Sequence, residues 1–160
     1  GLNLPNLFCE CTETMKAYKV ATHRHTSEIE QELSLLAGEE IVLSFTPHLV
    51  PMKRGIFATC YANLTGSATE DELLSLYRDF YKDEPFVRIY EKGSLPEVKH
   101  VTGSNYIGIG LKVDPRLHRV IVISCIDNLM KGAAGQAVQN MNLMFHLSET
   151  TALTDPGMYL

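Results

Sequence analysis

The sequence predicts an α+β domain whose mixed, mostly antiparallel sheet carries its helices on one face. Apolar runs of strand length are joined in some places by a tight turn and in others by helix-like segments, which is typical of this class. Two capping-box patterns, each followed by apolar residues at helical spacing, mark the starts of helices. With 160 residues, of which 45% are hydrophobic and 21% charged, the chain is long enough to bury one core. We therefore expect a single domain over residues 1–160.

The first half of the chain predicts one helix and two strands. The capping box Ser27-Glu28-Ile29-Glu30 and the closing Gly38 predict a helix over roughly 27–37. The short apolar run from Ile41 to Phe45 predicts a buried strand. The segment from Ile56 to Leu64 alternates well enough to predict another strand.

The second half predicts another helix and three more strands. A second capping box, Thr69-Glu70-Asp71-Glu72, precedes an amphipathic helical face that ends near Pro85. The strands are expected over three apolar segments: Phe86 to Tyr90, Tyr106 to Val113, and Val120 to Cys125. The last two flank the turn Asp114-Pro115-Arg116, so they are expected to form a hairpin. Gly108 and Gly110 indicate a bulge or a close backbone approach within that hairpin.

A long final helix is predicted from Asp127, as its cap, through about Phe145, with Met141, Met144 and Phe145 on its apolar side. Its opening Gly132-Ala133-Ala134-Gly135 contains two glycines, which reduce helix stability by about 1 kcal/mol each. Such a stretch is typical of a helix that another backbone or a flat ligand approaches closely. Packing against a second helix would account for it equally well.

Charge and hydropathy exclude several classes of function. A formal net charge of -5 and the absence of a Lys/Arg run argue against a nucleic-acid-binding protein. The apolar stretches are too short to span a bilayer, and the N-terminus lacks the plan of a signal peptide, so no membrane partner is expected. The four cysteines show no disulfide-rich spacing and are expected to be reduced thiols of a cytoplasmic protein: Cys9, Cys11, Cys60 and Cys125.

The densest chemical signal lies where an extended segment turns into the first helix. His23 and His25 are two residues apart, so an extended backbone directs both to one side. Glu28 follows in the first helical turn, within reach of His25, and a carboxylate beside an imidazole orients it for proton transfer. Arg24 adds a guanidinium suited to a carboxylate or phosphate.

The same cluster is compatible with two non-catalytic roles. Its residues could form a polar helix entry that only caps the helix and makes salt bridges. A metal site built from His23, His25 and either His48 or Glu28 is the second alternative, although no known tetrahedral spacing is present. Arg54, in a proline-stiffened loop, is a further candidate for holding an anionic substrate group, and a solvated surface base is the simpler assignment.

Five segments together resemble N-acetyl-gamma-glutamyl-phosphate reductases, which are acyl-phosphate reductases of arginine biosynthesis. The matching segments are His23 to Gln31, Phe45 to Met52, Arg54 to Ile56, Gly103 to Tyr106 and Asp127 to Phe145. The most specific of them contains Lys131-Gly132-Ala133-Ala134-Gly135-Gln136-Ala137-Val138-Gln139-Asn140. The resemblance implies a fold similar to the C-terminal domain of glyceraldehyde-3-phosphate dehydrogenase, with one sheet face used between the subunits of a homo-oligomer.

The resemblance also implies a reaction, NADPH reduction of an acyl phosphate to a semialdehyde through a cysteine thiolate. It implies that His25 is the acid/base, with His23 as a supporting donor or alternative base and Glu28 orienting the imidazole. Arg24 and Arg54 are then candidates for the substrate carboxylate or phosphate. Because the final helix resembles the segment that returns to the nucleotide domain, three residues are expected near the nicotinamide end of NADP: Asn128, Lys131 and Gly132.

The sequence lacks the Rossmann fingerprint and the nucleophilic-cysteine segment of this family. We therefore expect the chain to be the substrate-binding and oligomerisation domain, inactive alone, with the Rossmann domain of a parent chain as its partner. Ser27 stands where the family has proline, and Ile107-Gly108 where Cys-Asp is common. A lysine-pathway aminoadipyl-phosphate reductase and a non-catalytic oligomerisation module remain alternatives.

Overall fold

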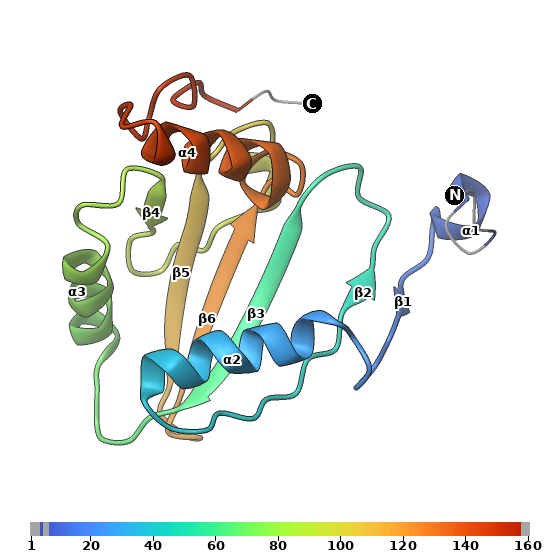
Figure 1. Ribbon diagram of the computed structural model, residues 1–160. Helices are drawn as coiled ribbons and strands as arrows, with labels where there is room; N and C mark the ends of the chain where they lie inside the picture. Colours follow the sequence, from blue (N-terminus) through green and yellow to red (C-terminus); the bar gives the residue numbers. More distant parts are fainter. Residues whose placement is uncertain (1–3, 5–6, 158–160) are drawn as a thin grey trace. The chain divides into compact units, whose positions relative to one another are not determined.

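The computed structural model describes Leu4 and residues 7–157, and the chain divides into two compact units (Figure 1). The first unit is Gly1–Lys53 and the second is Arg54–Leu160. One domain over 1–160 stays a prediction, and its ends, 1–3 and 158–160, lie outside the described residues. In the part that the structure describes, every helix is too short or too polar to span a membrane.

The first unit contains two helices and a pair of two-residue strands. Its elements are α1 (Phe8–Cys11), β1 (Lys16–Ala17), α2 (His25–Ala37) and β2 (His48–Leu49). β1 and β2 pair antiparallel, which the sequence did not predict because two-residue strands carry no alternation. α2 ends as predicted, with Gly38 as a left-handed cap at φ 72°.

The start of α2 differs from the prediction. The helix begins at His25, two residues before the predicted start, and the side chain of the N-cap residue Arg24 makes no capping bond. Ser27 Oγ donates a hydrogen bond to the Arg24 carbonyl at 3.4 Å, and Glu30 Oε1 accepts one from Leu43 N. The predicted capping box is therefore wrong, because Glu30 is used to hold the segment after the helix.

The predicted strand from Ile41 to Phe45 is also wrong, because that segment forms no strand. Its amides bind side chains of α2 in place of a neighbouring strand: Ile41 N donates to Ser34 Oγ at 2.8 Å, and Leu43 N to Glu30. Val42 is 77% exposed, so the apolar run is not a buried one. Here side-chain acceptors from the helix replaced the ladder bonds of a strand.

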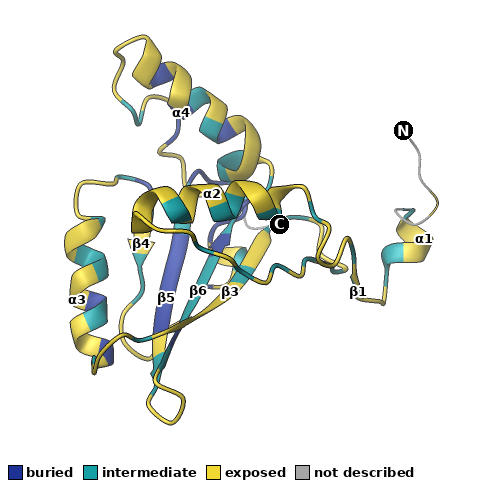
Figure 2. Ribbon diagram, turned by 60° about the horizontal axis from the view of Figure 1, so that its bottom comes forward, coloured by how far each residue is buried: buried dark blue, intermediate teal, exposed yellow. Residues whose placement is uncertain are grey.

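The second unit is built on a four-stranded sheet with the strand order β3-β6-β5-β4. β6 pairs antiparallel with both β3 and β5, whereas β4 is parallel to β5, so the sheet is mixed and mostly antiparallel as predicted. The strands are β3 (Ile56–Asn63), β4 (Val87–Ile89), β5 (Ile107–Asp114) and β6 (Arg119–Ile126). β5 and β6 form the predicted hairpin, and Figure 2 shows β5 as buried and the edge strand β3 as exposed.

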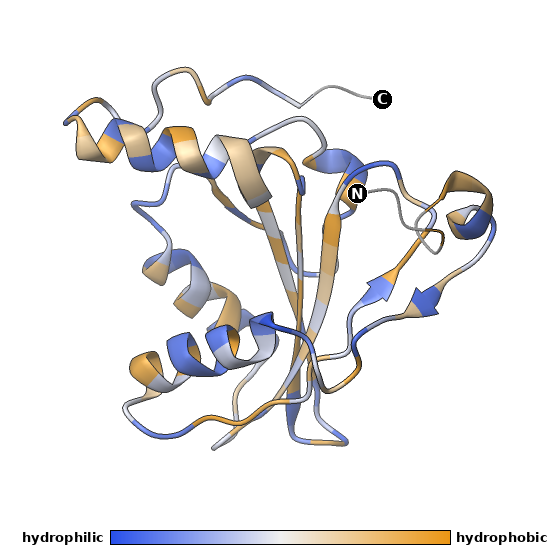
Figure 3. Cartoon of the chain, turned by 45° about the vertical axis from the view of Figure 1, so that its right-hand side comes forward, coloured by the Kyte–Doolittle hydropathy of each residue, from blue (hydrophilic) through white to orange (hydrophobic). Residues whose placement is uncertain are grey.

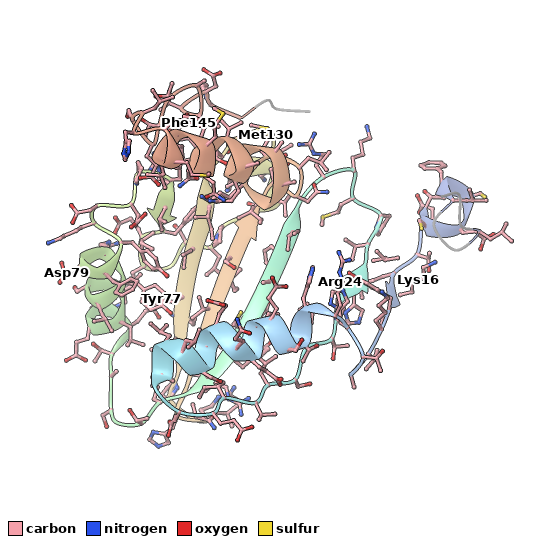
Figure 4. The ribbon with its side chains drawn as sticks, viewed as in Figure 1. Lys16, Arg24, Tyr77, Asp79, Met130 and Phe145 are labelled. Carbon is pink, nitrogen blue, oxygen red and sulfur yellow. The ribbon has the colours of Figure 1, made fainter. Side chains whose placement is uncertain are left out.

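Helix α3 (Glu70–Phe80) covers one face of this sheet. Its capping box is the predicted one, since Thr69 Oγ1 accepts from Glu72 N and Glu72 Oε2 accepts from Thr69 N at 2.8 Å. Leu74 of α3 packs in one cluster with Leu111 and Val120 of the sheet. Figure 4 shows Tyr77 on the sheet side of α3 and Asp79 on the opposite side.

The other face of the sheet presents apolar side chains near β3. Phe57 pairs with Cys125, and Tyr61 with Ile121, so these four side chains share the face opposite Val120 and Val122. Phe57 is 47% exposed and Tyr61 64% exposed. Figure 3 shows hydrophobic stretches along the strands of this sheet. The sheet thus has one covered face and one face open along β3.

Nearer β4, a loop covers this face of the sheet. The loop passes over the two glycines of β5, Gly108 and Gly110. A Cβ atom at Gly108 would lie 2.9 Å from Pro96 Cβ, and one at Gly110 would lie 2.8 Å from Pro96 Cδ. Pro96 is fully buried. The close approach expected at these glycines is therefore present.

The last helical segment follows β6 and contains a π-helical turn. The turn η3 (Met130–Ala134) continues directly into α4 (Gly135–Met144). The side of α4 expected to be apolar and packed is exposed, with Met141 at 44%, Met144 at 76% and Phe145 at 70%. Its buried residues are instead Gly135, Gln139 and Asn142. Cys9, Cys60 and Cys125 are free thiols.

Candidate functional site

The histidine cluster of the first unit lies at the start of α2, where His25 is the first helical residue. One turn later Glu28 places its Oε2 4.0 Å from His25 Nε2, and both side chains are exposed. That separation is the length of an ion pair, so Glu28 stabilises His25 when the imidazole carries a proton. An exposed imidazole beside a carboxylate can accept a proton from a ligand and return it.

His23 is engaged differently from His25. Its Nδ1 accepts a hydrogen bond from His25 N at 3.1 Å, so the neutral ring carries its proton on Nε2. Partial burial lowers the pKa of His23, and the positive charges of His25, Lys19 and Arg24 lower it further. His23 thus favours the neutral form, in which it holds the backbone of the residue that begins the helix.

Two aromatic rings that we did not predict to lie near His23 contact it. The ring of Tyr18 lies edge-on to it at 5.4 Å and that of Phe45 at 5.3 Å, measured between ring centroids. The ring of His25 lies at 4.9 Å. Phe45 belongs to the apolar run that we assigned to a strand, and its contact with His23 is what that run contributes to the site.

Arg24 precedes α2 directly, and its side chain is exposed (Figure 4). Its backbone is already helical, at φ −58° and ψ −29°, and the side chain makes no cap. Within residues 4 and 7–157, no three His, Cys, Asp or Glu side chains are grouped as a metal ion requires. The first unit therefore offers a cationic group and an acid/base pair at one helix start.

In the second unit Arg54 binds Asp127, a carboxylate that we expected only to cap a helix. Arg54 Nη2 donates to Asp127 Oδ1 at 2.6 Å, and the Asp127 side chain is fully buried. Burial raises the pKa of Asp127, but the hydrogen bonds from Arg54 and from the backbone N–H groups of Gly103, Met130 and Leu129 outweigh it and lower the pKa to about 2. Asp127 is therefore a carboxylate at neutral pH.

Asn128 lies two residues before the π-helical turn, and Gly132 lies within it. Asn128 Oδ1 accepts a hydrogen bond from Gly55 N at 2.7 Å. The Nδ2 hydrogens of the same amide take no part in this bond. Gly132 N donates to the Asp127 carbonyl at 2.9 Å. A Cβ atom at Gly132 would lie 3.3 Å from that carbonyl and 3.4 Å from Ile126 Cδ1, so the glycine allows close packing of this turn against the end of β6.

Lys131 is held above the ring of Phe86, with Nζ 5.3 Å from the ring centroid. Its Nζ donates to Gln139 Oε1 at 2.7 Å. Burial lowers the pKa of Lys131, while the charges of Glu149 and Glu84 act in the opposite direction. The ammonium group is thus partly desolvated and hydrogen-bonded to a neutral amide.

The amide of Gln139 is a functional feature that we did not predict from the sequence. Its Oε1 accepts from both Lys131 Nζ and Asn105 Nδ2, and its Nε2 donates to Glu149 Oε1 at 2.5 Å. Because a carboxylate can only accept, Glu149 fixes which end of the Gln139 amide faces Lys131. The Lys-Gly-Ala-Ala-Gly-Gln stretch lies in the same helical segment, but its pattern gave no sign of the partners.

The predicted residues thus fall into two groups. His23, Arg24, His25 and Glu28 lie together in the first unit, and Arg54, Asn128, Lys131 and Gly132 lie together in the second. Each group combines a cation with hydrogen-bonding side chains at the beginning of a helical segment. Such arrangements bind anionic or polar ligands.

Comparison with curated proteins gives consistent relatives. The chain is 64% identical over 158 residues to the N-acetyl-gamma-glutamyl-phosphate reductase of Acetivibrio thermocellus, covering 99% of this chain and 46% of that protein. It is 61% identical over 152 residues to the enzyme of the same name from Caldicellulosiruptor saccharolyticus, covering 95% of this chain and 44% of that protein. The chain therefore spans about half the length of the curated relatives it matches.

Among solved structures, aspartate semialdehyde dehydrogenase II from Vibrio cholerae matches with a TM-score of 0.67 at 16% identity, over 86% of this chain and 42% of that one. This likeness confirms the α+β fold. The resemblance to N-acetyl-gamma-glutamyl-phosphate reductases found in the sequence is confirmed by the curated relatives. The family model for the semialdehyde dehydrogenase dimerisation domain matches residues 1–128. The chain therefore belongs to the semialdehyde dehydrogenase dimerisation-domain family.

Proposed function

We propose that this chain is the substrate-binding and dimerisation part of an NADP-dependent N-acetyl-gamma-glutamyl-phosphate reductase of arginine biosynthesis, acting in the cytoplasm. The reaction reduces an acyl phosphate to a semialdehyde. The observation that carries the proposal is the His25–Glu28 pair, in which the backbone N–H of His25 also donates to His23 Nδ1. The pair occurs in a chain 64% identical to a reductase of this name. In this proposal a longer parent chain supplies the nucleotide-binding part and the nucleophilic cysteine, in keeping with the 46% of the A. thermocellus relative that this chain covers.

In this proposal His25 is the acid/base and Glu28 stabilises its protonated form. The Nε2 atom of His25 faces Glu28, whereas Nδ1 of His23 already accepts a hydrogen bond from the His25 backbone N–H. Arg24 binds the substrate carboxylate or phosphate through its exposed guanidinium. Arg54 keeps Nη2 on Asp127, so only its remaining N–H groups serve an anionic substrate.

The start of the final helical segment fits the nicotinamide end of a dinucleotide. The Nδ2 hydrogens of Asn128 can donate to a carboxamide oxygen, and Gly132 is exposed. Lys131 supplies a positive charge and is held by its hydrogen bond to the neutral amide of Gln139. When bound, the nicotinamide would supply the hydride, and these three residues would orient its ring.

The open sheet face along β3 is the proposed dimer contact. Phe57 and Tyr61 are large, exposed and on the same face as Ile121 and Ile123. An apolar patch of this kind on a sheet favours association with a second copy of the chain, because a two-fold axis covers both patches at once. The family description as a dimerisation domain supports this assignment.

The proposal is tested in a chimera in which this chain replaces the matching 158 residues of the A. thermocellus relative. We expect NADPH oxidation dependent on N-acetyl-gamma-glutamyl phosphate, at rates on the order of 1 per second or more. Parallel assays with the aminoadipyl phosphate separate the arginine-pathway substrate from the lysine-pathway alternative. A folded chimera with no activity on either acyl phosphate would favour a non-catalytic oligomerisation module.

A further inference from the structure

Asp127 is the most densely bonded carboxylate of the second unit. Its Oδ1 accepts from Arg54 Nη2 at 2.6 Å, from Leu129 N at 2.8 Å and from Met130 N at 2.9 Å. Its Oδ2 accepts from Gly103 N at 2.6 Å. With a fully buried side chain, Asp127 has no exposed oxygen left for a ligand, so it does not act on the substrate itself.

These bonds join three segments that are remote in sequence. Arg54 lies 73 residues before Asp127 and leads into β3, Gly103 lies in the loop before β5, and Leu129 and Met130 begin the π-helical turn. The neighbouring Asn128 strengthens the first link, because its Oδ1 accepts from Gly55 N. The buried Asp127 carboxylate therefore fixes the segment that leads into β3 against the start of the π-helical turn.

We propose that Asp127 is a positioning residue that holds Arg54 and the π-helical turn in the arrangement needed to bind substrate and cofactor. The inference rests on the proposed function, which places Arg54 at the substrate and places Asn128, just before the turn, with Lys131 and Gly132 of the turn, at the nicotinamide. Leu129 and Met130, the two amides that Asp127 caps, lie between Asn128 and Lys131 in the sequence. The main-chain carbonyl of Asp127 accepts from Gly132, so side chain and backbone of one residue fix both ends of this short stretch.

The variant Asp127→Asn separates positioning from simple stabilisation. The amide keeps an Oδ1 acceptor for the turn but removes the charge that Arg54 neutralises, and it sets an NH2 group against Gly103 N, where two donors face each other. In the chimera we expect the NADPH dissociation constant, from fluorescence titration, and the KM for the acyl phosphate each to rise about tenfold or more. Hydrogen exchange of the Leu129 and Met130 amides should also become faster.

Two further variants keep the test decisive. Arg54→Lys leaves the capping bonds to Leu129 and Met130 in place, so it should raise the KM for the acyl phosphate and leave NADPH binding within about twofold. If Asp127→Asn does not fold, Asp127→Glu keeps the charge and moves the oxygens by one methylene, and it should weaken NADPH binding in the same direction. The matched control is Asp114→Asn, because Asp114 also binds an arginine and a backbone amide, those of Arg116 at the hairpin turn.

The outcomes distinguish this inference from the proposed function. Lowered unfolding temperatures with unchanged NADPH binding and unchanged KM in both Asp127 variants would overturn the inference. An unmutated chimera that binds NADPH but reduces no acyl phosphate contradicts the proposed function, and the effect of Asp127→Asn on NADPH binding still decides the positioning role. An unmutated chimera that binds no NADPH would overturn both.

Discussion

At the scale of single residues, the two histidines of the first unit differ in which nitrogen is already engaged. His23 uses Nδ1 to accept the His25 amide, and His25 has its Nε2 near Glu28. We therefore predict that His25→Asn in the chimera lowers kcat by about 10²–10⁴, the usual range for loss of a positioned acid/base. Glu28→Gln should give a smaller loss of kcat, because the imidazole of His25 remains and only the negative charge beside it is removed. A larger loss from His23→Asn than from His25→Asn would identify His23 as the base.

The titration of His23 leads to a prediction about stability. Because the folded state lowers the pKa of His23 below its ordinary value of 6.5, the neutral ring contributes stability that is present above that value and lost as the pH falls below it. His23→Phe keeps an aromatic ring and removes the titration. The urea midpoint of the unsubstituted protein should therefore fall more than that of His23→Phe between about pH 7.5 and pH 5.5. Parallel curves for the two proteins would contradict this assignment.

The sequence predicted some of these residue contacts and not others. His25 and Glu28 are three residues apart, and helical geometry alone brings such side chains together. Arg54 and Asp127 are 73 residues apart, and their pairing depends on how β3 lies beside β6. The rings of Tyr18 and Phe45 around His23 depend in the same way on a chain reversal without a sequence signal.

At the scale of elements, two similar capping-box patterns had different outcomes. Thr69 caps α3, whereas Ser27 lies inside α2 and caps nothing. Thr69→Ala should therefore reduce the free energy of unfolding by about 0.5–2 kcal/mol, and Ser27→Ala should change it much less. Urea unfolding of both variants tests this contrast. Equal losses would indicate that Ser27 has a stabilising role of its own.

The glycine that begins α4 is the subject of a second prediction at this scale. A Cβ atom at Gly135 would collide with Asn105 Oδ1 and lie 2.9 Å from the Met130 carbonyl, and Asn105 is fully buried. Gly135→Ala should therefore destabilise the protein by about 1–3 kcal/mol, although alanine is the better helix former. Gly66→Ala is the matched control, because nothing lies within 4 Å of its Cβ position. A stabilised Gly135→Ala variant would contradict this packing.

The elements found from sequence are those whose signals are local. β3, β5 and β6 alternate or form a continuous apolar run, and α3 carries both a cap and an amphipathic face. The segment from Ile41 to Phe45 has the same apolar character, but its amides bind Ser34 and Glu30 of α2. Hydropathy alone does not tell whether a neighbouring strand or a side chain will satisfy a backbone amide.

At the scale of the whole molecule, the open sheet face leads to a prediction about assembly. Phe57→Asp places a charge in the middle of the proposed dimer contact, and burying an unpaired charge is unfavourable. In the chimera this variant should sediment as a monomer at micromolar concentration, whereas Leu76→Asp on the exposed side of α3 should not change the assembly. Leu76 is 60% exposed and Phe57 47%, so both variants place the same charge at an exposed apolar position. A Phe57→Asp variant that remains dimeric would place the contact elsewhere.

The π-helical turn has a consequence for how this protein tolerates changes of length. Three backbone hydrogen bonds in it join residues five apart, from Gly132 N to the Asp127 carbonyl, from Ala134 N to that of Leu129, and from Gly135 N to that of Met130. Such a turn holds one residue more than an α-helical turn, so removing one residue would leave an ordinary α-helical turn with α4 close to its present orientation. One added residue, by contrast, would rotate all of α4 by about 100°. Gln139 and Asn142 would then leave the interior together, and Gly135 would leave Asn105. The sequence between the buried carboxylate and the first glycine of α4 can therefore be shortened by one residue but not lengthened.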